Sequence, residues 1–111
     1  MNCRSPTRIN AVTTFANDDL DEATRLALFR SLTEIRQVEQ KAYDLFLQNL
    51  IKGTSHLALG HEAVAAGFGV AMRPDDYSFC TYRGHHHTLA RGASMPGVLG
   101  ELMGRDCGLL R

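Results

Sequence analysis

The strongest structural signal in this chain is the stretch LFRSLTEIRQVEQKAYDLF, residues 28–46. Its apolar residues recur every three or four positions, at Leu28, Leu32, Ile35, Val38, Ala42 and Leu45. This spacing places the apolar side chains along one face of an α-helix, and the polar residues, Glu39 included, fall mostly outside that stripe. The pattern predicts a long helix over about residues 19–49 that packs against the rest of its own chain. A coiled coil is the alternative, although the repeat lasts under three heptads.

Residues at both ends of this helix carry start and stop signals. Asn17 or Asp18 can cap its first turn, where acidic side chains suit the helix dipole. Three acidic residues follow there: Asp19, Asp21 and Glu22. Gly53 is expected to stop the helix after Lys52, because glycine readily adopts the left-handed conformation that ends helices.

A second, small-faced helix is predicted from near His61 to Met72. Its two glycines, Gly67 and Gly69, weaken an isolated helix by about 1 kcal/mol each. Tolerance of that cost indicates close backbone packing against another element.

The last third of the chain predicts three short elements. Residues 77–82 are rich in aromatic and β-favouring side chains, which predicts a short strand. Gly92 closes a short helical piece. Ser94 and Pro96 open a last helix that ends at Gly104.

Composition excludes several classes of function. The chain has 111 residues, 12 basic and 12 acidic side chains, and 44% apolar residues. That length suits one small domain, and the zero net charge is unlike that of a strongly basic nucleic-acid-binding protein. The longest nearly apolar run, residues 63–72, is half the length of about 20 residues that a bilayer span needs. No nucleic-acid or membrane partner is expected.

The cysteines and the N-terminus suggest a compartment. Three widely spaced cysteines, Cys3, Cys80 and Cys107, form no Cys-x-x-Cys pair. That usage favours a reducing compartment, and we expect a cytoplasmic protein. Residues 1–17 are expected to be a flexible polar arm. A transit peptide is the alternative, because the arm has basic residues and no acidic residue before Asp18.

Histidines cluster in the middle of the sequence, at His56, His61, His85, His86 and His87. Such a cluster suggests proton transfer or metal binding. The zinc-protease spacing fails, because Ala65 stands where a second histidine would be needed after His61. We expect no metal ligands among these histidines. Two residues before His85, Arg83 can hold a phosphate through its planar guanidinium. An anion-binding site and a solvated loop without a ligand are therefore equally good interpretations of residues 82–85.

Eight pieces of sequence stand in a recognisable order: residues 35–36, 39–46, 55–57, 60–63, 73–77, 81–85, 89–92 and 101–104. No piece is specific by itself. Together they resemble the alpha subunit of the thiamine diphosphate-dependent 2-oxo acid dehydrogenases. This is the decarboxylating component of the pyruvate, branched-chain and acetoin dehydrogenase complexes.

The resemblance implies a fold, an activity and partners. The fold is an α/β thiamine diphosphate-binding fold, of which residues 18–111 are the N-terminal, mostly helical part. The activity is oxidative decarboxylation of a pyruvate-like 2-oxo acid, or acetoin cleavage, with the thiazolium ring as electron sink. The expected partners are a beta subunit, in an alpha-two beta-two assembly, and a lipoyl-bearing acyltransferase.

The resemblance also implies site residues by position. Tyr82 and Arg83 match the pair that contacts the cofactor, with the arginine on its diphosphate. Two histidines match catalytic positions: His56 matches one at the substrate end of the site, and His85 matches the one that follows the Tyr-Arg pair near the reacting centre. Glu62 is not assigned as the cofactor-activating glutamate, since that role belongs to the beta subunit; a charge in a first helical turn is preferred.

Departures from the family pattern limit the carry-over. The family usually has glutamine where this chain has His61, and commonly glycine where it has His86. The family's Gly-Asp-Gly and Asn magnesium ligands are not in this sequence, so we expect them beyond Arg111. Residues 1–111 are therefore expected to be inactive alone. The alternative is a non-catalytic helical interaction module that keeps the subunit-packing face.

Overall fold

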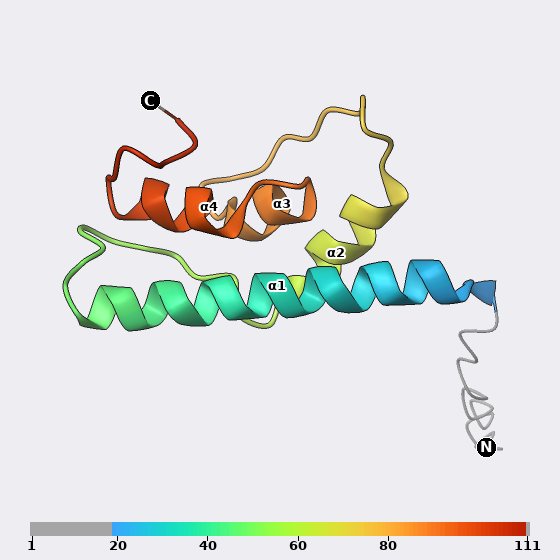
Figure 1. Ribbon diagram of the computed structural model, residues 1–111, viewed down its shortest axis with the longest axis horizontal. Helices are drawn as coiled ribbons and strands as arrows, with labels where there is room; N and C mark the ends of the chain where they lie inside the picture. Colours follow the sequence, from blue (N-terminus) through green and yellow to red (C-terminus); the bar gives the residue numbers. More distant parts are fainter. Residues whose placement is uncertain (1–18, 111) are drawn as a thin grey trace, which may run out of the picture.

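The computed structural model describes residues 19–110, which form four helices. These are α1 (Glu22–Leu47), α2 (Glu62–Ala71), α3 (His85–Ala90) and α4 (Met95–Leu102). The three short helices lie along one side of α1, with α2 over its N-terminal half and α4 over its C-terminal half (Figure 1). All four predicted helices are confirmed, and Ser94 caps α4 as expected, its Oγ accepting the Gly97 N–H at 3.2 Å.

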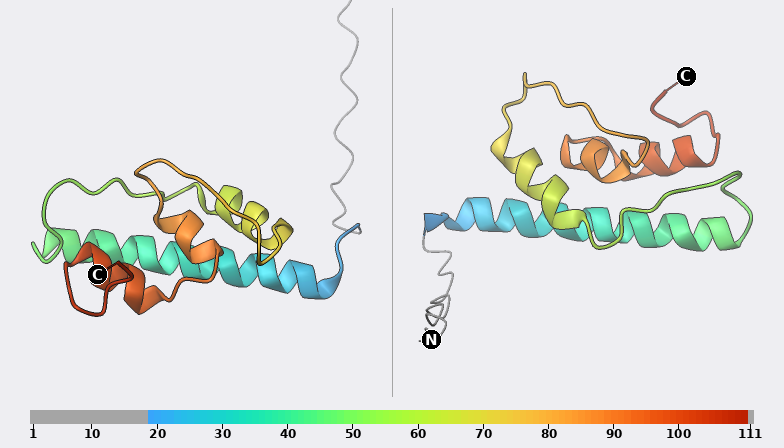
Figure 2. Two further views of the ribbon diagram at one scale, coloured as in Figure 1. Left: turned by 90° about the horizontal axis from the view of Figure 1, so that it is seen from above. Right: turned by 180° about the vertical axis from the view of Figure 1, so that it is seen from behind.

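One core joins all four helices. Its buried members are Ile35 and Val38 of α1, Ala65 and Ala66 of α2, Leu89 of α3 and Val98 of α4. A second, smaller cluster packs Ile51 against Ala42 and Leu45. The chain after α1 turns back and runs along that helix (Figure 2). The apolar stripe predicted from the sequence is therefore the face of α1 that builds the core.

Both ends of α1 differ from the sequence prediction. Asp21 is the N-cap, and its carboxylate accepts the Thr24 N–H at 2.6 Å. The predicted caps, Asn17 and Asp18, lie outside the described residues. The helix ends at Leu47, two residues before the predicted boundary at about residue 49 and well before the stop expected after Lys52, because Asn49 takes the left-handed conformation with φ of 58°. Asparagine tolerates that conformation better than most residues, so the predicted stop at Gly53 was wrong.

The predicted strand at residues 77–82 is also wrong. The segment is non-helical, and residues 19–110 contain no strand. Its large side chains face solvent: Tyr77 is 90% and Phe79 98% exposed. A strand needs a neighbour for its backbone hydrogen bonds, and none lies beside this segment in the described part of the chain. The structure therefore confirms only the helical part of the expected α/β fold.

Close packing of α2 is confirmed at one of its two glycines. A Cβ on Gly69 would lie 2.7 Å from the Ala90 carbonyl oxygen and 2.8 Å from the Ala90 Cβ. A Cβ on Gly67 would meet nothing within 4 Å. Gly69 is thus the residue that lets α2 approach the end of α3.

Across residues 19–110, every helix is too short or too polar to cross a membrane.

Candidate functional site

Three of the four predicted site residues surround one cavity of about 270 Å³, which we call the histidine cavity. His56 comes from the loop after α1, Tyr82 from the segment before α3, and His85 from the first position of α3. The rings of His56 and Tyr82 are in contact, with centroids 4.8 Å apart and planes tilted by 54°. The remaining wall is formed by Ile51, Lys52, Thr54, Ser55 and Leu102.

Arg83, the fourth predicted residue, does not line the histidine cavity. Its side chain is half-buried, and its Nε is fully buried without a hydrogen-bond partner. A buried donor without a partner is costly, and an anionic oxygen is the acceptor that a guanidinium binds best. Arg83 therefore has an unused hydrogen bond next to the cavity-lining residue Tyr82.

Glu39 of α1 is a site feature that sequence reasoning missed. It was assigned mostly to the polar side of the helix, yet it is completely buried. Its Oε2 accepts the Ala58 N–H at 2.9 Å, and its Oε1 lies 3.4 Å from His85 Nδ1. Its position four residues after Ile35 and three before Ala42, within the apolar stripe, was the available signal.

His86 is a core residue, only 4% exposed. Burial lowers its pKa, and the neighbouring His87, with its ring centroid 4.2 Å away, acts in the same direction. The Glu39 carboxylate opposes this shift. Because His86 lies inside α3, its backbone suits any residue, and a side chain is accommodated where the family commonly has glycine.

Glu62 holds the start of α2 against α1. Its Oε1 accepts hydrogen bonds from Arg36 Nε at 2.6 Å and from the Gly60 N–H at 3.1 Å. The Arg36 hydrogen bond is the main cause that lowers the pKa of Glu62 to about 2. The sequence interpretation of Glu62 as a charge in a first helical turn is confirmed.

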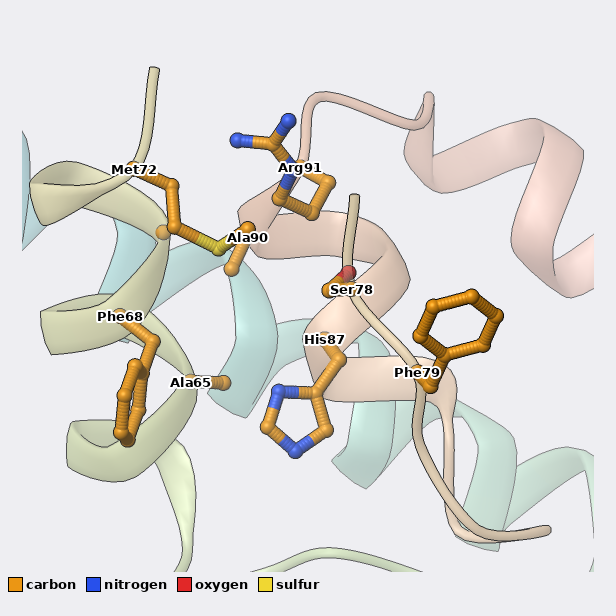
Figure 3. A pocket seen from close by; sticks show the side chains of 9 residues that line it. Ala65, Phe68, Met72, Ser78, Phe79, His87, Ala90 and Arg91 are labelled. Atoms are coloured by element: carbon orange, nitrogen blue, oxygen red, sulfur yellow. The ribbon is translucent and has the colours of Figure 1, made fainter. Parts of the chain in front are cut away.

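A second cavity, of about 190 Å³, lies between α2, α3 and the segment before α3 (Figure 3). Phe68 of α2 and Met72, the residue after α2, lie on one side of it, and the His87 ring points into the space beside Phe68, whereas the ring of Phe79 is turned outward on the other side. Arg91, at its edge, donates from Nη2 to the carbonyls of Arg73 at 3.1 Å, Pro74 at 3.3 Å and Asp76 at 2.8 Å. Largely apolar walls make this cavity a packing gap rather than a place for a polar ligand.

Within residues 19–110, no three His, Cys, Asp or Glu side chains are grouped so that they could hold a metal ion.

Comparisons with known proteins agree on one family. The profile of the family described as "Dehydrogenase E1 component" matches residues 30–110. The alpha subunit of acetoin:2,6-dichlorophenolindophenol oxidoreductase from Bacillus subtilis (strain 168) is 36% identical over 83% of this chain and 28% of its own length. The alpha subunit of the pyruvate dehydrogenase E1 component from Rhizobium meliloti is 42% identical over 76% of this chain and 24% of its own length.

The corresponding mitochondrial subunit from Schizosaccharomyces pombe is 41% identical over 75% of this chain. It is covered over 20% of its own length, so the chain spans only 20% to 28% of the length of these three curated relatives. No solved structure gave a significant match. Because the family profile covers most of its residues, the chain belongs to the dehydrogenase E1 component family.

Proposed function

We propose that this chain is part of the alpha subunit of a thiamine diphosphate-dependent 2-oxo acid dehydrogenase. The complete enzyme would decarboxylate a pyruvate-like 2-oxo acid, or cleave acetoin, and pass the acyl group to a lipoyl-bearing acyltransferase. Support comes from relatives whose names specify alpha subunits of pyruvate and acetoin enzymes. The lipoyl partner comes from the family resemblance alone.

The unsatisfied Nε of Arg83, the residue that follows the cavity-lining Tyr82, is the observation that carries this proposal. A diphosphate oxygen would accept the hydrogen bond that Arg83 Nε does not make, and the adjacent Tyr82 would contact the same ligand. When bound, thiamine diphosphate supplies an electron sink for cleavage of the bond next to the keto group. His56 and His85 would then move protons and stabilise negative charge that develops on the substrate oxygen.

The size of the histidine cavity favours a site completed by another surface. Its volume of about 270 Å³ lies just below the range of roughly 300–1,000 Å³ usual for ligand pockets. A beta subunit in an alpha-two beta-two assembly would supply the missing walls. Magnesium would be held by residues outside those described.

We propose a cytoplasmic location, because the cysteine usage favours a reducing compartment.

Binding of thiamine diphosphate and of thiamine, which lacks the two phosphates, tests the role of Arg83. We expect Arg83→Gln to weaken binding of thiamine diphosphate by roughly 10- to 100-fold, as loss of a charge-assisted hydrogen bond does. The affinity of Arg83→Gln for thiamine should equal that of the unmodified protein, because thiamine has no phosphate for Arg83 to bind. Isothermal titration of the complete alpha subunit, with magnesium and with and without a beta subunit, gives both affinities.

Arg30→Gln is the matched control, because Arg30 is an exposed arginine of α1. It should bind both ligands as the unmodified chain does. Failure of the complete alpha subunit to bind thiamine diphosphate even with magnesium and a beta subunit, or equal losses in the two variants, would overturn the proposal.

A non-catalytic interaction module is the second candidate, and the exposed rings of Tyr77 and Phe79 favour it. This candidate predicts that the chain binds a beta subunit while thiamine diphosphate adds nothing to that affinity. The enzyme subunit predicts instead that the cofactor strengthens the association.

A further inference from the structure

We propose that Glu39 is a positioning residue that holds the proton of neutral His85 on Nδ1. His85 Nε2 is then the ring nitrogen left to accept a proton in the histidine cavity. The value of this arrangement for catalysis rests on the proposed function, whereas the arrangement itself does not.

The burial of Glu39 is the first argument. Its carboxyl group is completely buried in the face of α1 that builds the core, where an uncompensated carboxylate is costly. The Ala58 N–H satisfies Oε2, whereas Oε1 is buried without a hydrogen-bond partner. Buried polar atoms in folded proteins are almost always hydrogen-bonded, so we expect a donor near Glu39 Oε1.

The position of His85 is the second argument. Its Nδ1 lies 3.4 Å from Glu39 Oε1 and is itself buried without a hydrogen-bond partner. That separation exceeds a good N–H···O hydrogen bond by only about 0.2 Å, so a small side-chain movement would satisfy both atoms. His86 also feels the Glu39 charge, but the nitrogen within ion-pair distance belongs to His85.

The chemistry of the two groups fixes the direction. A carboxylate only accepts hydrogen bonds, so the nitrogen that faces it must carry hydrogen. A neutral imidazole has a single N–H, and its second nitrogen is then an acceptor. Since the His85 ring lines the histidine cavity as well, Glu39 would set which nitrogen is free to act there.

Glu39→Gln reverses the donor and acceptor pattern with little change in shape. The Gln oxygen must face the Ala58 N–H, which leaves the amide NH₂ toward His85 Nδ1. A donor at that place favours a bare Nδ1 and a proton on Nε2. A purely structural role, in which Glu39 only accepts from Ala58, predicts no change in His85.

Long-range ¹H–¹⁵N correlation spectra of the labelled chain report the tautomer directly. Near pH 8, where an ordinary imidazole is neutral, we expect the Nδ1–H form of His85 to dominate. In Glu39→Gln the ratio of the two tautomers should shift toward Nε2–H by at least about tenfold. The His85 signals are assigned by their loss in His85→Gln.

Glu34→Gln, at an exposed position of the same helix, is the control and should leave the tautomer unchanged. A dominant Nε2–H form in the unmodified chain would overturn the proposal, and so would the same tautomer in the unmodified chain and Glu39→Gln. If Glu39→Gln does not fold, the tautomer of the unmodified chain decides alone. The spectra need no cofactor, so failed thiamine diphosphate binding contradicts the proposed function and leaves this inference standing.

Discussion

The α1 core face and the segment at residues 77–82 both carry large apolar side chains, but these side chains lie in opposite environments. Ile35 is completely buried, whereas Phe79 is 98% exposed. A helix satisfies its backbone with its own hydrogen bonds and needs only one covered face. An extended segment depends on a neighbouring strand for both hydrogen bonds and cover. The described part of the chain thus covers the apolar face of α1, but it provides no neighbouring strand for residues 77–82.

The largest expected contrast is between a core and a segment truncation. Ile35→Ala should lower the free energy of unfolding by about 2–5 kcal/mol, because it removes buried methyl groups and leaves a cavity. Phe79→Ala should change it by less than about 0.5 kcal/mol, since the ring contacts mainly solvent. Urea unfolding followed by circular dichroism measures both. Comparable losses would mean that residues 77–82 are part of the core.

A smaller contrast separates the two glycines of α2. Gly69→Ala brings a Cβ against the Ala90 backbone, and relief of that clash costs about 1–3 kcal/mol. The better helix propensity of alanine offsets up to about 1 kcal/mol of this cost. Gly67→Ala meets open space and should stabilise by about 0.5–1 kcal/mol. Opposite signs in urea unfolding are expected, and equal effects would refute the close approach of α2 to α3.

The smallest effect concerns the ion pair between Arg36 and Glu62. Because the folded pKa of Glu62 is lowered from 4.5 to about 2, its stabilisation is present above pH 4.5 and is lost as pH falls toward 2. Half of Arg36 is exposed, so we expect only about 1–2 kcal/mol from the charge. Glu62→Gln should lower stability at pH 7 and converge with the unmodified chain near pH 2.

Glu34→Gln serves as the control for this pH dependence, since Glu34 is exposed on α1. Its unfolding free energy should follow the unmodified chain over the whole pH range. A gap between Glu62→Gln and the unmodified chain that stays constant from pH 7 to pH 2 would show that the charge contributes nothing.

The helices were predictable because their signals are local. Apolar spacing locates α1, and the Ser94 cap followed by Pro96 locates α4. The end of α1 was predicted to within two residues, but the left-handed residue that ends it was taken to be Gly53 rather than Asn49, because glycine is the stronger sequence signal for that conformation. The strand failed because residues 77–82 have the right side chains and no neighbour in the described chain. Strand propensity is a property of single residues, whereas a strand forms only beside another strand to which its backbone is hydrogen-bonded.

The candidate site was predictable in part. The resemblance named His56, Tyr82 and His85, and the structure brings these three around one cavity. It did not reveal that Arg83 stands apart from that cavity. Glu39 was missed because a charged residue is rarely fully buried, so a glutamate is normally assigned to a solvent-exposed position. Its partners, Ala58 and His85, lie 19 and 46 positions further along the chain, beyond any local pattern.

The three hydrogen bonds of Arg91 have a consequence for association. They fasten residues 73–76 to the end of α3, while the start of α3 fixes the other end of the segment that carries Tyr77 and Phe79. A loop held at both ends samples fewer conformations, so less entropy remains to be lost when another surface covers its rings. Arg91 would thereby lower the entropic cost of any association that covers these rings.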